Sequence, residues 1–443
     1  MGIGQSRFDA AASILLRETQ AVSVELVTDE LGWSATRASW DRLLTENPNA
    51  SPYWTWEYLN EWRDVLGKVC PQSGVKYAHY TAVIRHENRV VGIFPMFVEK
   101  GLGLRRLRLL GFNGGVGPAD MTEEPICLTS PGHEAVAYDG LAQAIHRLRM
   151  RRVFDMIDIR LWIRDESPTP TKLPHRLKKG PAVAEIPGTW AEYRKVLTKS
   201  MRDNIGYYPR LLTRHGHQFQ IRIVRDPSEM EGAIETLVDL HKVRNKASKD
   251  KRRVDHFPSE IEARFETAAL AALAKQERAF VAILEIDGQP AAAQAFMEYG
   301  PTLVVGYSGF DPQWSAYSPL MVLQSDVFQK SVESGTRRLD FQGGERMWQT
   351  RWQAKPEGSI AGITIIRKNP LSAIKAAGYF AKREILKAWS RRRPPEFWTK
   401  LTSKPLVVFG VDLARYDPHL ASHAIRLGHL ACHPATAHLL RRA

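Results

Sequence analysis

The sequence has little cysteine and no long hydrophobic run, and both scarcities limit the kind of protein it encodes. Its three cysteines, Cys70, Cys127 and Cys432, are far apart and form neither a CxxC motif nor a paired framework, which predicts a reducing compartment. No stretch approaches the roughly 20 apolar residues of a membrane helix, and no basic-then-apolar leader opens the chain. We therefore expect a cytoplasmic protein, with the inner face of the membrane as the alternative.

Several catalytic signatures are missing as well. The chain has no Walker loop, no GxSxG elbow and no HExxH motif. Four C-terminal histidines have i, i+4 spacings that suit zinc on helices: His419, His423, His429 and His433. No carboxylate or second cysteine completes a compact set around them, so we interpret them as a solvated tail and expect no metal site.

The positive charge is concentrated near the C-terminus. The net charge is +14, from 62 basic and 48 acidic residues, and residues 371–443 contain 13 Lys and Arg against 4 Asp and Glu. We predict a basic helical extension over 369–443, which could lie on an acidic membrane surface or simply be solvated. The rest of the chain is not basic enough to suggest that its core binds nucleic acid.

Residues 280–352 give the clearest pattern of elements. Asp287-Gly288 is a hairpin signal, and Ser318-Pro319 opens a helix with a capping residue and an N1 proline. The predicted order is strand 280–285, strand 291–297, strand 303–307, a helix from 318 to about 335, and strand 338–341.

The first half of the chain repeats this order. It gives a hairpin over 77–99, a strand at 106–110, a helix at 135–149 and a strand at 154–161. A polar, proline-rich linker at 165–171 separates the halves. We predict an α/β protein with mixed (α+β) sheets, divided into a leader (1–20), two tandem units (21–180 and 181–368) and the basic extension (369–443).

The second unit resembles the GNAT acyltransferase superfamily, and more closely its CelD/BioF2-like acetyltransferase branch, which is related to the Fem-type aminoacyltransferases. The resemblance rests on the element order and on the turn Asp340-Phe341-Gln342-Gly343-Gly344-Glu345. It implies two GNAT-like units and transfer of an acyl group from acetyl-CoA to an amine. The implied acceptor is a small or lipid-linked amino sugar, or another envelope or exopolysaccharide precursor.

The same resemblance implies where the cofactor lies. In a GNAT unit two neighbouring central strands separate and take the pantetheine arm between them, while the following helix N-terminus holds the pyrophosphate. The matching residues here are Tyr317, Ser318, Leu320 and Met321. The glycine-rich signature of typical GNAT enzymes is absent, so an ordinary capped helix is the competing interpretation.

Acyl transfer needs a group that accepts the amine proton and a donor for the oxyanion. The candidate catalytic residues are Asp340, Glu345, His241 and Tyr307, with Tyr317 as another proton donor to the leaving thiolate. The candidate substrate-binding residues are Arg202 on a basic amphipathic helix over 195–214, Arg244, and Trp348. Asp340 could instead cap the glycine turn.

Two other functions fit the sequence. The basic helix and tail are compatible with a tRNA-dependent, Fem-like aminoacyltransferase, although no coiled-coil insert is evident. A non-catalytic binding or scaffold protein is the second alternative. It is favoured slightly by Gln349, because the branch often has a lysine after the aromatic residue that is Trp348 here.

Overall fold

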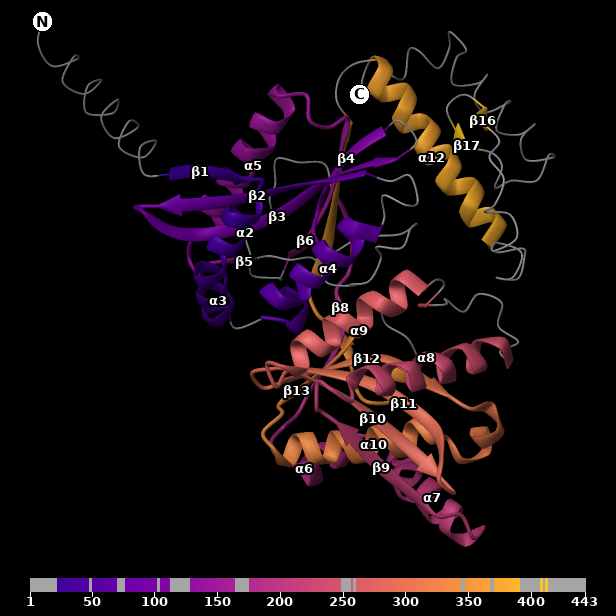
Figure 1. The fold of residues 1–443 in the computed structure, drawn as a ribbon. Helices are drawn as coiled ribbons and strands as arrows, with labels where there is room; N and C mark the ends of the chain where they lie inside the picture. The colour runs from indigo at the N-terminus through magenta and orange to yellow at the C-terminus, as the bar shows by residue number, and fades with distance from the viewer. Residues whose placement is uncertain are drawn as a thin grey trace, which may run out of the picture.

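Two β-sheets, one in each half of the chain, organise the fold (Figure 1). The computed structural model describes residues 22–47, 50–69, 76–101, 104–111, 128–163, 175–247, 256–257, 260–343, 347–366, 370–390, 407–408 and 411–412. The predicted leader, the proline-rich linker and the histidine-rich tail lie outside these residues.

The first sheet has the strand order β1-β2-β3-β4-β6-β15-β7, with β5 paired to β3. Its strands are β1 Val22–Val27, β2 Lys76–His86, β3 Arg89–Gly101, β4 Leu104–Leu109, β5 Leu128–Thr129, β6 Met156–Ile163, β7 His175–Lys179 and β15 Ser359–Ile366. The helices of this half are α2 Glu30–Ala35, α3 Arg37–Glu46, η1 Pro52–Trp54, α4 Trp56–Val69, α5 Glu134–Met150 and α12 Pro370–Ser390.

The second sheet has the order β14-β8-β13-β12-β11-β10-β9. Its strands are β8 Pro181–Glu185, β9 Phe219–Val224, β10 Ala279–Ile286, β11 Gln289–Tyr299, β12 Thr302–Phe310, β13 Arg338–Gly343 and β14 Lys355–Pro356. The helices around it are α6 Trp190–Val196, α7 Lys199–Arg214, α8 Met230–Ala247, α9 Glu260–Ala274, η3 Pro312–Tyr317, α10 Pro319–Glu333 and α11 Met347–Thr350. A separate short pair is formed by β16 Val407–Val408 and β17 Val411–Asp412.

The two sheets are built on the same plan, as the sequence predicts. The run β1-β2-β3-β4-β6 corresponds strand for strand to β9-β10-β11-β12-β13. In each run the last two strands are parallel and a helix connects them, α5 in the first and α10 in the second. The protein is therefore a mixed α/β protein made of two tandem units of one topology.

A two-stranded ribbon passes between the sheets. β15 pairs with β7 in the first sheet, and β14 pairs with β8 in the second, so that 175–183 and 355–363 run side by side through both. The sequence analysis places 359–366 in the second unit, whereas β15 completes the first sheet beside β6. Hydrophobic periodicity does not show this difference, because an apolar strand fits either sheet.

Glycine is needed where the ribbon crosses. The Gly180 N–H donates to the Gly358 carbonyl at 3.1 Å, and a Cβ on Gly180 would lie 1.8 Å from the Glu357 carbonyl oxygen. Gly358 has φ +59°, the left-handed region. A side chain at position 180 would push the two strands apart where the units join.

The interior is continuous between the units on one side of the second sheet. α4 of the first unit packs against α9 of the second (Figure 1), and the rings of Tyr58 and Phe265 meet edge to face at 5.4 Å. One core extends from the first unit through α8 and α9 to one face of the second sheet. A second core lies under the other face, against α6, α7 and α10.

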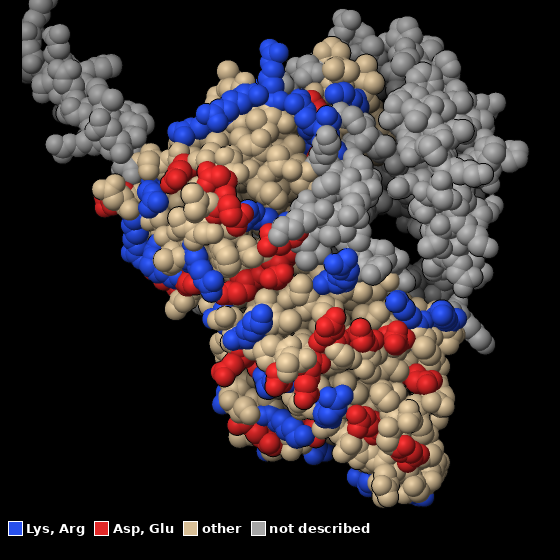
Figure 2. Space-filling view, viewed as in Figure 1, with Lys and Arg blue, Asp and Glu red and all other residues tan. Residues whose placement is uncertain are grey.

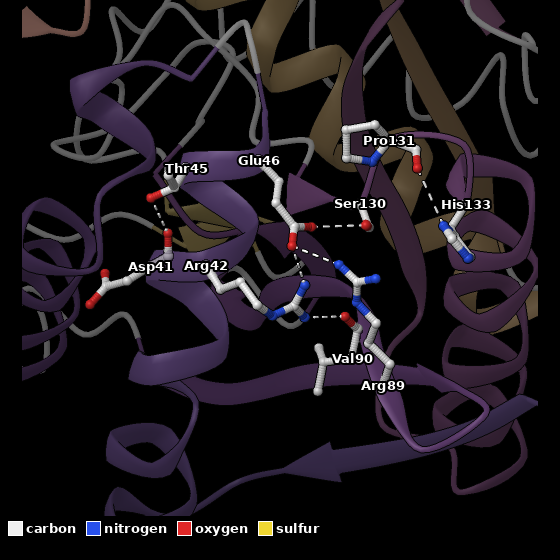
Figure 3. A network of polar contacts seen from close by, with 9 residues as sticks. All are labelled: Asp41, Arg42, Thr45, Glu46, Arg89, Val90, Ser130, Pro131 and His133. Atoms are coloured by element: carbon white, nitrogen blue, oxygen red, sulfur yellow. Dashed lines mark hydrogen bonds and ion pairs between the residues drawn. The ribbon is translucent and has the colours of Figure 1, made fainter.

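The surface of the first unit contains a network of charges around Glu46 (Figure 3). Its carboxylate accepts hydrogen bonds from Arg42 at 2.8 Å, Arg89 at 2.7 Å and the Ser130 hydroxyl at 2.9 Å. Partial burial acts to raise the pKa of Glu46, but the bonds from Arg42, Ser130 and Arg89 outweigh it and the pKa is lowered. The network joins α3, the β2–β3 hairpin and the residue after β5.

α12 packs against strands β4 and β15 of the first sheet. The guanidinium of Arg106 hydrogen-bonds the Tyr379 hydroxyl and lies 4.3 Å from the centre of its ring. Asp155 accepts from the Ser372 hydroxyl at 3.2 Å. The predicted basic extension thus begins as a helix packed on the first unit. Among the described residues, none of the helices has the length and apolar composition to cross a bilayer.

Candidate functional site

Strands β12 and β13 separate after a short paired stretch, as the sequence analysis expects. They are parallel and pair only at Thr302–Arg338, Leu303–Leu339 and Val304–Asp340. β12 then continues to Phe310 and β13 to Gly343 without further pairing between them. We call this gap between 305–310 and 341–343 the slot. Along the slot β12 and β13 are therefore not paired with each other.

A β-bulge in β12 borders the slot. Gln294 of β11 pairs with Ser308 and Phe296 pairs with Val305, so Gly306 and Tyr307 together lie opposite one β11 residue, Ala295. A Cβ on Gly306 would lie 2.8 Å from the Ala295 carbonyl oxygen, so glycine permits the close approach of the two strands. Bulges of this kind redirect backbone groups and are over-represented beside active sites.

The end of β13 is a tight polar turn. The Asp340 carboxylate accepts the Gln342 N–H at 2.7 Å, and Gln342 has φ +58°. This confirms that Asp340 caps its own turn. The Gln342 side-chain amide reaches across the base of the slot to the Val305 carbonyl at 3.5 Å, and it also bonds the Tyr53 hydroxyl of the first unit.

Gln349 and Arg338 also hold β13. The buried side chain of Gln349 donates to the Phe341 carbonyl at 3.1 Å. Arg338 pairs with Glu185 and Glu357. Its burial disfavours the charge, but Glu357 and Asp340 raise the pKa of Arg338, which therefore stays charged beside the Asp340 carboxylate.

His241 and Arg244 lie where α8 covers β12. The Nε2 atom of His241 accepts from the Asn245 side chain at 2.8 Å and from the His256 N–H at 3.4 Å, so the ring proton is on Nδ1, which donates to the Ser308 carbonyl at 3.1 Å. Arg244 donates to the Ser308 hydroxyl at 3.3 Å. Both side chains therefore contact Ser308 of β12.

Tyr307 and Trp348 lie on opposite sides of the slot. The Tyr307 ring contacts His256 at 5.1 Å and Phe257 at 5.3 Å, next to His241. Trp348 on α11 packs edge to face on Phe341 at 5.4 Å and is 37% exposed. These positions bring the candidates Tyr307, His241 and Arg244 together on the β12 side, and Asp340 and Trp348 on the β13 side.

The predicted cofactor residues lie at the start of α10. Ser318 occupies the N-cap position, but it has φ 47° and ψ 59° and its side chain makes no capping bond, so the expected side-chain cap is wrong. Tyr317 is held by two histidines, His215 at 2.9 Å and His217 at 3.2 Å, and Asp287 pairs with His217 at 2.7 Å. Leu320 and Met321 are half-buried against the second core.

Arg202 lies at the junction between α6 and α7. The predicted helix over 195–214 is broken at Thr198, which caps α7 through the Met201 N–H. Arg202 donates to the carbonyls of Lys195, at 3.2 Å, and Leu197, so it closes the end of α6. Glu345 lies outside the described residues. Within the described chain, no group of three His, Cys, Asp or Glu residues could hold a metal ion.

Sequence reasoning missed three residues of the site: Tyr53, Gln342 and Gln349. Tyr53 is nearly 300 positions from Gln342 in the chain, and nothing in its local pattern predicts that contact. Gln342 lies within the turn that carried the resemblance, and Gln349 lies four residues beyond that turn. The available signal for these residues was a glutamine near the end of a buried strand. The side-chain amide of a buried glutamine must find hydrogen-bond partners.

Comparison with known proteins supports the fold and the second unit. Residues 199–350 match the sequence model of the family described as Acetyltransferase (GNAT) domain. The structure is similar to a crystal structure of FemX, with a TM-score of 0.55 and 10% identity over 79% of this chain and 99% of that one. At this identity the similarity establishes the fold.

Two weaker structural matches are a tandem GNAT protein from the clavulanic acid biosynthesis pathway and L-PGS from Bacillus licheniformis. The first has a TM-score of 0.42 and 11% identity, covering 78% of this chain and 98% of that one. The second has a TM-score of 0.40 and 12% identity, covering 65% and 85%. No curated protein matches the sequence.

Proposed function

Because residues 199–350 are a GNAT-family acyltransferase domain in a chain with the FemX fold, we propose that this protein is an N-acyltransferase that uses acetyl-CoA. The observation that carries the proposal is the slot: β12 and β13 stop pairing after Val304 and Asp340. The extended pantetheine arm, which contains two amides, can pair with the backbone of β12 as a strand would.

The residues around the slot can be given chemical roles. Asp340 is buried at the slot's base, and we assign it to accept the amine proton through a water molecule. Tyr307, on the β12 side, is the proposed proton donor to the leaving thiolate. His241 and Arg244 position β12 through Ser308. Tyr317, Ser318, Leu320 and Met321 are proposed to border the phosphate end of the cofactor, at the positive end of α10.

The proposed acceptor is the amine of an amino sugar or a related envelope or exopolysaccharide precursor, free or lipid-linked. Trp348 supports this proposal because a half-exposed indole beside β13 offers a flat apolar surface to a sugar ring. Contact of the basic tail with an acidic membrane surface would suit a lipid-linked acceptor, and most of that tail lies outside the described residues.

Calorimetric titration with acetyl-CoA tests the proposal. We expect one site per chain, with CoA competing and ATP not competing, because the slot takes the pantetheine arm and ATP has none. Absence of binding at millimolar acetyl-CoA would overturn it.

The tRNA-dependent alternative is favoured only by the FemX fold. On the face shown in Figure 2, acidic and basic side chains are interspersed over both units, and acidic side chains lie along the line where the units meet. Steeply salt-dependent tRNA binding would support this alternative. The scaffold alternative predicts that neither acetyl-CoA nor tRNA binds.

A further inference from the structure

A buried side-chain amide lies at the base of the slot, and residues of both units fix its orientation. The Nε2 atom of Gln342 donates to the Tyr53 hydroxyl of the first unit and to the Val305 carbonyl of β12 at 3.5 Å. Tyr53 and Gln342 are 1% and 8% exposed, so these bonds are made almost entirely away from water. The amide therefore connects the end of β13 both to β12 and to the first unit.

Tyr53 is itself held in place by the first unit. It belongs to η1, where its N–H donates to the Ser51 hydroxyl at 3.4 Å. The next carbonyl along η1, that of Trp54, accepts the indole N–H of Trp40 at 2.7 Å. The hydroxyl that faces Gln342 thus has a position set by the core of the first unit before any ligand binds.

The two bonds determine which way the Gln342 amide faces. A backbone carbonyl only accepts and an amide nitrogen only donates, so Nε2 is the atom that faces Val305. The oxygen on the same carbon, Oε1, is the remaining polar atom of the side chain. Within the described part of the chain, this oxygen has no hydrogen-bond partner. An acceptor with so little contact with water favours a ligand that brings a donor to it.

Asp340 places a second acceptor beside this oxygen. Its carboxylate accepts the Gln342 N–H at 2.7 Å, so both side chains leave the same tight turn. Both are buried at the end of β13, where β12 no longer pairs with it. A primary amine has two N–H bonds and can meet two acceptors, whereas a hydroxyl has a single O–H bond. The pair of acceptors therefore suits an amine better than a hydroxyl.

We propose that Gln342 is a specificity-determining residue whose Oε1 atom accepts one N–H of the acceptor amine, and that Tyr53 is the positioning residue that holds the amide in this orientation. The inference rests on the proposed function and names a feature of its acceptor, a primary amine. It also gives the first unit a part in the reaction, since Tyr53 completes a site built on the second unit.

The proposed step uses both N–H bonds of the amine. The amine nitrogen forms a bond to the acetyl carbon, and the bond from that carbon to the CoA sulfur breaks. One amine proton passes through water toward Asp340, the leaving thiolate takes up a proton, and the second N–H stays bonded to Gln342. A hydroxyl that gives up its only proton leaves Oε1 without a partner, and an unpaired buried group of this kind discriminates against the wrong substrate.

Two substitutions test the inference, each with a matched control. Gln342→Met keeps nearly the same volume and removes the amide. Its control is Gln329→Met, because Gln329 is exposed on α10 and bonds Glu333, one turn away. Tyr53→Phe removes one hydroxyl, and its control is Tyr207→Phe, because Tyr207 is exposed on α7. Having two positions keeps the inference testable if one variant does not fold.

The first measurement needs no ligand. In protein labelled with ¹⁵N at glutamine side chains, the Gln342 amide signal is the one that Gln342→Met removes. Tyr53→Phe should shift this signal because the amide loses a hydrogen-bond partner, whereas Tyr207→Phe should leave it in place. An unmoved signal in Tyr53→Phe would overturn the positioning role of Tyr53, whether or not the protein binds acetyl-CoA.

The second measurement compares acetyl transfer to glucosamine with transfer to glucose, two probes that differ by an amine or a hydroxyl at one carbon. In Gln342→Met, kcat/KM for glucosamine should fall about 10- to 100-fold, and in Tyr53→Phe by a smaller factor. Transfer to glucose and KM for acetyl-CoA should stay nearly unchanged. An equal loss for both probes would show a purely structural role and overturn the inference.

Two results for the wild type separate this inference from the proposed function. Protein that binds acetyl-CoA but acetylates neither probe would overturn the acceptor role of Gln342 and leave the cofactor proposal standing. Absence of acetyl-CoA binding would refute the proposed function, and the amide signal would still decide whether Tyr53 positions Gln342.

Discussion

Glu266 on α9 gives the sharpest test of how the two units pack. Its side chain is 3% exposed, on a helix that packs against α4, α8 and β10, and its Oε1 atom has no hydrogen-bond partner. Burial raises the pKa of the Glu266 carboxyl to about 8. The carboxyl is therefore protonated in the folded protein at neutral pH, whereas it is ionised in the unfolded chain.

The sign of the pH effect follows from this difference. A carboxyl whose pKa is higher in the folded state favours folding most at low pH, and this advantage is lost as the pH rises through the folded-state value. Folding raises the pKa of the Glu266 carboxyl from the ordinary 4.5 to about 8. At 1.36 kcal/mol per pKa unit, the pH-dependent contribution of Glu266 to the free energy of unfolding is at most about 5 kcal/mol. About 2–3 kcal/mol of this contribution is lost between pH 6 and pH 9.

Urea unfolding of the wild type and Glu266→Gln at a series of pH values measures the effect. We expect the variant to become more stable relative to the wild type as the pH rises from 6 to 9. Glu235→Gln, at an exposed position on the neighbouring helix α8, is the control and should follow the wild type. Parallel pH profiles for the wild type and Glu266→Gln would show that Glu266 is not buried without compensation, and the packing around α9 would need revision.

Three further predictions concern the joins between elements. Gly180→Ala should cost about 2–4 kcal/mol in urea unfolding, since its Cβ would lie 1.8 Å from the Glu357 carbonyl oxygen, whereas Gly232→Ala, with open space at its Cβ, should be neutral or stabilising by about 1 kcal/mol. Glu46→Gln should cost no more than about 1 kcal/mol at neutral pH and progressively less as the pH falls below the ordinary 4.5, because the lowered pKa of Glu46 gives stability that is lost on acidification; a loss that does not shrink on acidification would contradict the charge network. Tyr379→Phe should increase protease cleavage within α12 and leave cleavage of the second unit unchanged, since it removes the hydroxyl bonded by Arg106; equal cleavage of α12 in both proteins would argue against this attachment.

The sequence predicts the repeated part of the fold well because local rules determine it. Asp287-Gly288 forms the hairpin turn between β10 and β11, and the apolar face of 320–328 becomes α10. The same periodicities in the first half predict β2, β3 and α5. Since two copies of one pattern must fold alike, the tandem arrangement follows from the sequence.

Features that depend on the other unit are not predictable in this way. The placement of β15 in the first sheet, the contact of Tyr53 with Gln342, and the burial of Glu266 on α9 all depend on residues distant in sequence. Helix periodicity shows only that position 266 is polar, and a lone glutamate in such a pattern predicts solvent exposure.

The candidate site was predicted in outline but not in its contacts. The separation of β12 from β13 follows from the resemblance, and the capping role of Asp340 follows from the residues themselves. The contacts of His241 and Arg202 with backbone carbonyls were not predicted, and they have a common reason. A polar side chain next to an unpaired carbonyl is used to satisfy that carbonyl, as with Ser308 and Leu197.

A crystal structure of the protein with bound CoA tests the central claim most directly. The account predicts that the pantetheine arm lies between β12 and β13 and hydrogen-bonds the β12 backbone within 305–310, with the phosphates toward the start of α10. A complex in which CoA lies elsewhere, or in which the gap beyond Val304 and Asp340 is filled by the protein's own side chains, would contradict it.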